Sequence, residues 1–176
     1  MTLLAASAGK LDAAQTRPTF EEVYAEHVAF VWRVLRALGV APHGIEDAAQ
    51  DVFVIVHRRL PDFEGRSAIT TWLFSITRKV AWKHRRKQQP APIAPPQPSI
   101  DPHAAAERGE AAAIIATAMD QLDDDKRIVF ALVELEQIAV AEVARMLGIN
   151  VNTAYSRLRL ARSELTAFVR RTRSPR

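Results

Sequence analysis

A proline-rich stretch at 88–102 divides the chain into two parts. It holds six of the ten prolines in the 176-residue sequence, and proline lacks a backbone N–H and clashes with the preceding helical turn. The stretch can therefore be neither helix nor central strand, and we expect an extended linker at 88–106. On either side about 70 residues remain, enough for a small helical core. The sequence predicts two domains that move independently, at 19–87 and 107–171, with tails at 1–18 and 172–176.

Apolar residues recur at helical spacing throughout both parts, and no alternating strand pattern occurs. Thr19 and Glu22 form a capping box before the first periodic segment, and Gly39 is a glycine stop after it. The sequence therefore predicts an all-α protein, with helices at 20–38, 45–60, from about 68 to 87, 104–122, 125–135, 140–147 and 151–171.

The last two predicted helices have the spacing of a helix-turn-helix. Ala144 is small enough for a close helix crossing, and Gly148, four residues later, tolerates the positive φ of a turn. The second helix places an apolar set inward, Ala154, Leu158, Ala161 and Leu165. Its other face is arginine-rich, with Arg170 near its end as a phosphate contact. DNA binding is the predicted role of Asn152, Thr153, Tyr155, Ser156, Arg157, Arg159 and Arg162.

Charge is arranged in blocks of alternating sign. Acids predominate at 45–64 and 120–142, and bases at 77–88 and 145–176, a pattern that suits contact with both a polyanion and a basic protein partner. The sequence has no cysteine and no H-x-x-x-H pair, so we expect no metal, cofactor or small-molecule substrate. Asp124, Asp125 and His84 are the groups available to an enzyme, but nothing pairs them. With no long apolar run, a cytoplasmic protein is expected.

Three stretches together resemble a known family. They are EDAAQDVFVIVHRRL at 46–60, DFEGRSAITTWLFSITRK at 62–79 and LGINVNTAYSRLRLARSEL at 147–165. The second contains a G-x-S-x-x-x-T-W-L signature, with Gly65, Ser67, Thr71, Trp72 and Leu73. In this order the stretches resemble the extracytoplasmic-function (ECF) sigma factors, two-domain initiation factors of bacterial RNA polymerase.

The resemblance implies three binding surfaces. The first, for the clamp helices of the largest subunit of core polymerase, comprises Glu46, Asp47, Gln50, Asp51 and Phe53. The second, for the promoter minus-ten element, which it recognises and melts, comprises Gly65, Arg66, Ser67, Lys79, Lys83, Arg86 and Lys87. The third is the helix-turn-helix, for the minus-thirty-five element.

The residues themselves leave simpler interpretations open. Phe53 suits a core position, the acidic side chains suit a solvated helix face, and the loop at 63–68 suits a plain helix connection. Trp72 lies on an apolar stripe and is expected in the core, whereas Trp82 falls off that stripe and stays ambiguous. The family commonly has Asn at the position of Lys79.

Two questions about partners remain at this stage. An anti-sigma factor is a usual partner in the family, although no residue here identifies one. The alternative function is a helix-turn-helix regulator that does not bind core polymerase. That alternative explains the arginines of the second part, but neither the acidic second helix nor the loop and the basic third helix.

Overall fold

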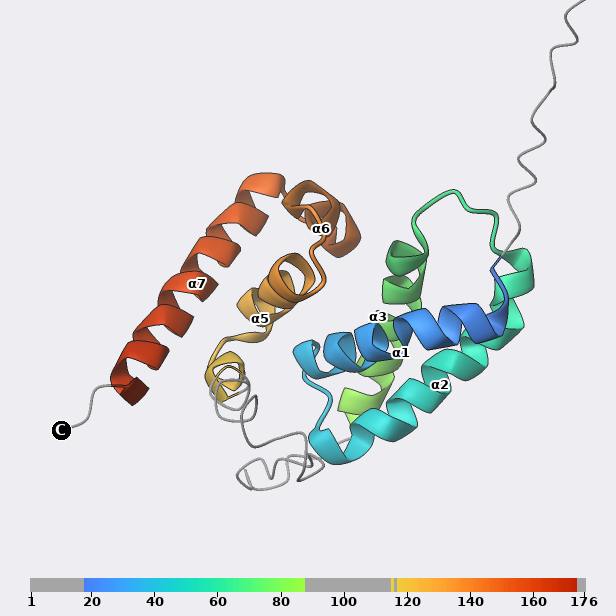
Figure 1. Ribbon diagram of the computed structural model, residues 1–176, viewed down its shortest axis with the longest axis horizontal. Helices are drawn as coiled ribbons and strands as arrows, with labels where there is room; N and C mark the ends of the chain where they lie inside the picture. The colour runs from blue at the N-terminus through green and yellow to red at the C-terminus, as the bar shows by residue number, and fades with distance from the viewer. Residues whose placement is uncertain (1–17, 88–114, 116, 174–176) are drawn as a thin grey trace, which may run out of the picture.

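The computed structural model describes residues 18–87, 115 and 117–173, and these residues form an all-helical protein without a strand (Figure 1). The first part contains α1 (Phe20–Ala37), α2 (Ile45–Arg59) and α3 (Ile69–Lys87), with one-turn helices at Pro42–Gly44 and Leu60–Asp62. The second contains α5 (Asp124–Phe130), the π-helical turn η3 (Ala131–Leu135), α6 (Val140–Leu147) and α7 (Val151–Arg173). The predicted all-α class is confirmed.

Local sequence features account for the helix ends. The Thr19 hydroxyl accepts a hydrogen bond from the Glu22 backbone N–H (3.2 Å), while the Glu22 carboxylate accepts from Thr19 N–H (2.8 Å). The predicted capping box is therefore confirmed. After α1, Gly39 has φ +80°, as a glycine stop requires. The helix expected at 104–122 and the linker at 88–106 lie largely outside the described residues, of which 115 and 117–120 are helical.

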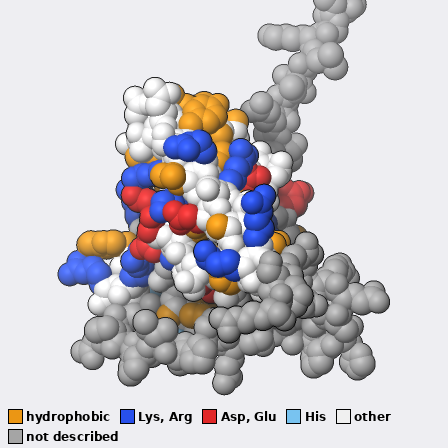
Figure 2. Space-filling model, turned by 90° about the vertical axis from the view of Figure 1, so that its left-hand side faces the viewer, with side chains coloured by type: hydrophobic (Ala, Val, Ile, Leu, Met, Phe, Trp, Pro, Cys, Tyr) orange, Lys and Arg blue, Asp and Glu red, His pale blue; other side chains and the backbone are white. Residues whose placement is uncertain are grey.

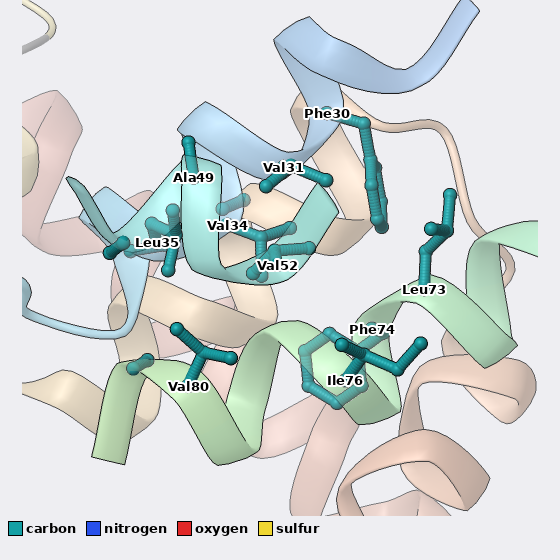
Figure 3. Close-up of a cluster of buried hydrophobic side chains, with 14 of the residues drawn as sticks. Phe30, Val31, Val34, Leu35, Ala49, Val52, Leu73, Phe74, Ile76 and Val80 are labelled. Atoms are coloured by element: carbon teal, nitrogen blue, oxygen red, sulfur yellow. The ribbon is translucent and has the colours of Figure 1, made fainter. Parts of the chain in front are cut away.

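The core of the first part lies where α1, α2 and α3 meet (Figure 3). It is built from fully buried aliphatic and aromatic side chains of all three helices, including Val31, Val34, Leu35, Val52, Leu73 and Phe74. Thr77 is also buried, and its hydroxyl donates to the Leu73 carbonyl at 2.8 Å. The buried hydroxyl is therefore satisfied. This bundle fixes α2 and α3, which carry most of the candidate residues of the first part.

The two parts pack against each other, contrary to the expectation of independent movement. One cluster of buried apolar residues runs from the α1–α3 bundle into the second part through Val129, Leu132 and Val143. Polar contacts border it, namely Arg33–Glu136, Arg36–Asp120, Arg85–Asp124 and the hydrogen bond from Thr71 to Glu142. The prediction was based on the composition of the linker. Docking depends instead on the surfaces of the two domains, which share buried apolar residues.

Candidate functional site

The outer face of α2 presents a compact acidic and amide group. Glu46, Asp47 and Gln50 are exposed, whereas Phe53 is only 6% exposed. The Phe53 ring packs edge-on against Tyr24, with the ring centroids 4.7 Å apart. Phe53 therefore occupies the core position that its chemistry suggested, and the three polar residues form the accessible surface.

Asp51 is engaged with α3 instead of pointing freely into solvent. Its Oδ2 atom lies 3.0 Å from His84 Nε2 and 3.3 Å from Lys83 Nζ. The hydrogen bond from His84, with smaller contributions from Lys83, holds the pKa of Asp51 below its ordinary value. The carboxylate thus links α2 to α3. Its contact with Lys83 joins two residues that the family resemblance assigned to different surfaces.

Beside the acidic group, the structure reveals an apolar hollow that sequence reasoning missed. The hollow has a volume of about 610 Å³, and Phe20, Tyr24, Val28, Trp32 and Val54 supply its apolar lining. Trp32 and Val54 are 43% and 50% exposed. Large apolar residues off the buried stripe of a helix were the available sequence signal. Glu46 and Gln50 also line the hollow, which places an apolar contact area next to the acidic one.

The loop before α3 is shaped by a glycine. Gly65 has φ +69°, and a Cβ built there would meet no atom within 4 Å. The glycine is therefore required by its backbone conformation, and the space beside it is open. Arg66, with an 83% exposed side chain, pairs with Glu64 in the loop, and Ser67 is exposed.

The first tryptophan of α3 anchors this loop to the bundle. The Trp72 ring lies 5.1 Å from the Phe63 ring, centroid to centroid, and it packs against the main core. Trp72 is therefore partly buried against the core, on the apolar stripe that the sequence indicated. Its contact with Phe63 positions the loop that carries Gly65 and Ser67.

The outer face of α3 is basic and carries an exposed aromatic ring. Lys79, Lys83 and Arg86 are all exposed, and the Arg86 guanidinium lies over the Trp82 ring at 4.7 Å from its centroid. Trp82 is 62% exposed, which removes it from the core. The side chain of Lys87 lies outside the described residues.

The helix-turn-helix is present in α6 and α7. Gly148 ends α6 in the left-handed conformation with φ +70°, and the Ile149 N–H donates to the Ala144 carbonyl at 3.0 Å. At the start of α7, the Asn150 side chain accepts from the Asn152 N–H at 2.8 Å. The predicted inward face is confirmed, since Ala154, Leu158, Ala161 and Leu165 are all buried.

The exposed face of α7 contains the remaining predicted DNA-contacting residues. Asn152, Thr153, Tyr155, Ser156 and Arg159 are exposed, and Figure 2 shows basic side chains along this side of the molecule with acidic ones between them. Two arginines have acidic neighbours: Arg157 pairs with Asp125, and Arg162 with Glu134. Within the described part of the chain, Arg159 forms no ion pair, so its guanidinium is available to a ligand.

Within the residues that the structure describes, no group of three or more His, Asp or Glu side chains is placed to hold a metal ion. No helix in that part of the chain is both long and apolar enough to cross a membrane.

These features define a class of protein. A helix-turn-helix with an open arginine-bearing face is a DNA-reading module. The first domain adds an exposed acidic face on α2 and an exposed basic face on α3. The structure is thus that of a two-domain transcription factor.

Comparison with protein families identifies which one. The model of sigma-70 region 2 matches residues 23–91, and that of sigma-70 region 4 matches residues 112–165. Together they cover more than half of the chain. The chain belongs to the sigma-70 family, and it is a promoter-directing sigma factor of RNA polymerase.

Individual relatives agree with this assignment. The ECF RNA polymerase sigma factor SigM of Mycobacterium tuberculosis is 27% identical over 156 residues, covering 87% of this chain and 78% of SigM. The RNA polymerase sigma factor CnrH of Cupriavidus metallidurans is 26% identical over 166 residues, covering 85% of this chain and 86% of CnrH. The resemblance to ECF sigma factors is therefore confirmed.

Two solved structures share the fold. The structure of CnrH in complex with the cytosolic domain of CnrY superimposes with a TM-score of 0.63 at 25% identity, covering 88% of this chain and 89% of that one. The sigma factor RpoE of Bartonella quintana, in complex with the anti-sigma factor NepR, gives a TM-score of 0.71 at 22% identity, covering 86% and 96%.

Proposed function

We propose that the sigma-factor function is divided among three surfaces of the chain. The first is the outer face of α2, which binds the clamp helices of core polymerase through Glu46, Asp47 and Gln50. The exposure of all three and the negative charge of Glu46 and Asp47 support this role, because a basic partner helix needs an accessible acidic counterpart. Asp51 acts through its bonds to α3, and Phe53 supports the surface from below.

The second surface is the minus-ten reader, formed by the loop at 63–68 and the basic face of α3. The open space beside Gly65 lets the backbone approach a nucleotide, and Arg66 and Ser67 contact phosphate or a base edge. Lys79, Lys83 and Arg86 follow the phosphate backbone, with Lys87 continuing the same run, because exposed cations along one helix face match a line of phosphates.

The third surface is the exposed face of α7, which reads the minus-thirty-five element. Tyr155, Ser156 and Arg159 lie in the N-terminal half of α7, the half that ordinarily contacts base edges. Asn152 and Thr153 lie at its start. Arg157 and Arg162 are held by carboxylates of the same domain, so they reach DNA only by exchanging those partners.

The factor acts in the cytoplasm, where polymerase and promoter DNA lie, and it acts by binding, without a catalytic step. An anti-sigma factor is a further partner in this proposal, since two similar sigma factors form complexes with a second protein, CnrH with the cytosolic domain of CnrY and RpoE with the anti-sigma factor NepR. The observation that carries the proposal is the presence of an acidic α2 face and a basic α3 face on one three-helix bundle.

The test is transcription by core polymerase on a pool of genomic fragments, with and without the purified full chain. We expect new transcripts whose start sites share an upstream minus-ten and minus-thirty-five element. If the chain binds DNA but neither associates with core polymerase nor starts transcription, the alternative of a regulator independent of polymerase is correct.

A further inference from the structure

The arginines of α7 are not equally available to DNA. Arg162 pairs with Glu134 of η3, and Arg157 pairs with Asp125 of α5. We propose that these two carboxylates compete with DNA phosphates for the arginines, and so lower the affinity of α7 for DNA of any sequence. The inference rests on the proposed DNA-reading role of α7. It adds two residues that set how firmly this helix holds DNA outside a promoter.

Helix geometry places the two paired arginines on either side of the base-reading row. With 3.6 residues per turn, Ser156, Arg159 and Ser163 share one side of α7, and all three are exposed. Arg157 and Arg162 lie on opposite flanks of this row. The flanks of a helix that enters the major groove face the two phosphate backbones. A free arginine on either flank would therefore reach a phosphate whatever the base sequence.

Glu134 occupies Arg162 through two hydrogen bonds. The Arg162 Nε atom donates to Glu134 Oε1 at 2.9 Å, and Nη2 donates to the same oxygen. The Gln137 side chain donates to the Glu134 carbonyl at 2.6 Å, which supports the turn that carries the carboxylate. A carboxylate offers a guanidinium the same charge-assisted hydrogen bonds as a phosphate. A DNA phosphate must therefore displace Glu134 before it can use Arg162.

The second pair has the same arrangement on the other flank. Asp125 lies in the first turn of α5, and its side chain is 65% exposed. The side chain of Arg157 is 27% exposed, against 59% for Arg162. Because Arg157 is the less accessible arginine, its release should add less to DNA binding. Asp125→Asn should act in the same direction as a change at Glu134, but more weakly.

Exposure and counterion release set the size of the effect. The side chains of Glu134 and Arg162 are both partly exposed (31% and 59%), so their ion pair shifts an equilibrium by at most about 5-fold. Each additional phosphate contact steepens the dependence of log affinity on log salt concentration by about 0.9. Releasing Arg162 should therefore raise the affinity and steepen its salt dependence together. A merely structural role for Glu134 would not steepen the salt dependence.

The experiment measures binding of the full chain to a scrambled DNA duplex over a range of salt concentrations. Glu134→Gln removes the competing charge and keeps the size of the side chain. Glu164→Gln is the matched control, because Glu164 lies on α7 two residues from Arg162 and its partner Lys126 keeps a second carboxylate, Asp123. We expect Glu134→Gln to bind about 2- to 5-fold more tightly at low salt, with a slope steeper by about 0.9. Glu164→Gln should leave the slope unchanged.

A double-variant comparison tests the competition itself. Arg162→Ala should weaken binding less than about 2-fold in the wild-type background, but about 2- to 5-fold in the Glu134→Gln background, where the arginine is free. The preferred upstream element, taken from the transcription assay above, should gain from Glu134→Gln by the same factor as the scrambled duplex. The reason is that phosphate contacts carry no sequence information.

Three results would overturn the inference. They are equal losses for Arg162→Ala in both backgrounds, no steeper slope in Glu134→Gln than in the wild type, and a gain confined to one of the two duplexes. Core polymerase that starts no transcription with the wild-type chain would instead overturn the proposed function. The two failures are distinguishable, because the duplex measurements contain no polymerase.

Discussion

We expect the docking of the two domains to depend on the Arg33–Glu136 ion pair more than on the other ion pairs between them. Arg33 on α1 donates from Nε and Nη2 to the two carboxylate oxygens of Glu136, with the Nη2–Oε2 bond at 2.9 Å. The Glu136 side chain is 8% exposed and that of Arg33 45%. The hydrogen bond to Glu136 raises the pKa of Arg33 above its ordinary value. We therefore expect Arg33→Ala to separate the domains.

The size of the effect follows from burial. Breaking a fully buried ion pair costs about 3–5 kcal/mol, because an unpaired charge is left behind. Arg33 is nearly half exposed, so water screens part of this cost, and ~1–3 kcal/mol is expected. At 1.4 kcal/mol per factor of ten, the docking equilibrium should shift roughly 5- to 150-fold towards the separated state.

The distance between the domains measures this shift. The chain has no cysteine, so dyes attached to Glu21→Cys and Ser163→Cys, one exposed position in each domain, report domain separation by energy transfer. Arg36→Ala is the matched control, since the Arg36–Asp120 pair is exposed on both sides (46% and 35%). We expect it to cost less than ~1 kcal/mol.

The double variant Arg33→Ala with Glu136→Ala should dock better than Arg33→Ala alone, because the unpaired carboxylate is then removed. Equal energy transfer in the wild type and Arg33→Ala would refute the reasoning, as would an effect no larger than that of Arg36→Ala. A wild-type chain whose domains are already separate in solution would refute it too.

Three further predictions concern the surfaces. Asp47→Lys should abolish association with core polymerase while leaving the helical circular dichroism intact, because a like charge opposite a basic helix costs several kcal/mol; unchanged association would contradict the α2 assignment. Arg159→Ala in the full chain should weaken binding by ~1–3 kcal/mol at the preferred upstream element only. Arg170→Ala should weaken binding to all DNA sequences and reduce the slope of affinity against salt concentration by about one. Equal losses for Arg159→Ala on preferred and scrambled duplexes would make Arg159 a phosphate contact. The pKa of Asp51 is lowered in the folded chain, so the ionised carboxylate stabilises the fold. Asp51→Asn should therefore lower the free energy of unfolding by less than ~1 kcal/mol at pH 7, because the side chain is 44% exposed. This loss should shrink below about pH 4, where acid protonates the wild-type carboxylate. Urea unfolding of the wild type and Asp51→Asn at pH 7 and below about pH 4 checks the last prediction, which fails if the difference in stability is the same at both.

The sequence by itself determined the helices and the inner face of the DNA-reading module. The capping box at Thr19, the left-handed turn at Gly148 and the burial of Ala154 and Leu158 all follow from neighbours a few residues apart. Such features depend on backbone geometry and helical periodicity, which the order of residues states directly. The family resemblance added the division into surfaces, which periodicity alone does not contain.

Only the tertiary structure decided which charged groups are paired and which are open. Arg33 and Glu136 are 103 positions apart, and Asp51 meets His84 across two helices. The family resemblance assigned Asp51 to a partner, and the sequence left Trp82 ambiguous. A carboxylate or an indole holds the same position in the helical sequence pattern whether its side chain is solvated, paired or buried. Its surroundings are set by how the helices and the two domains pack, and that packing joins residues whose separation along the chain hides their contact.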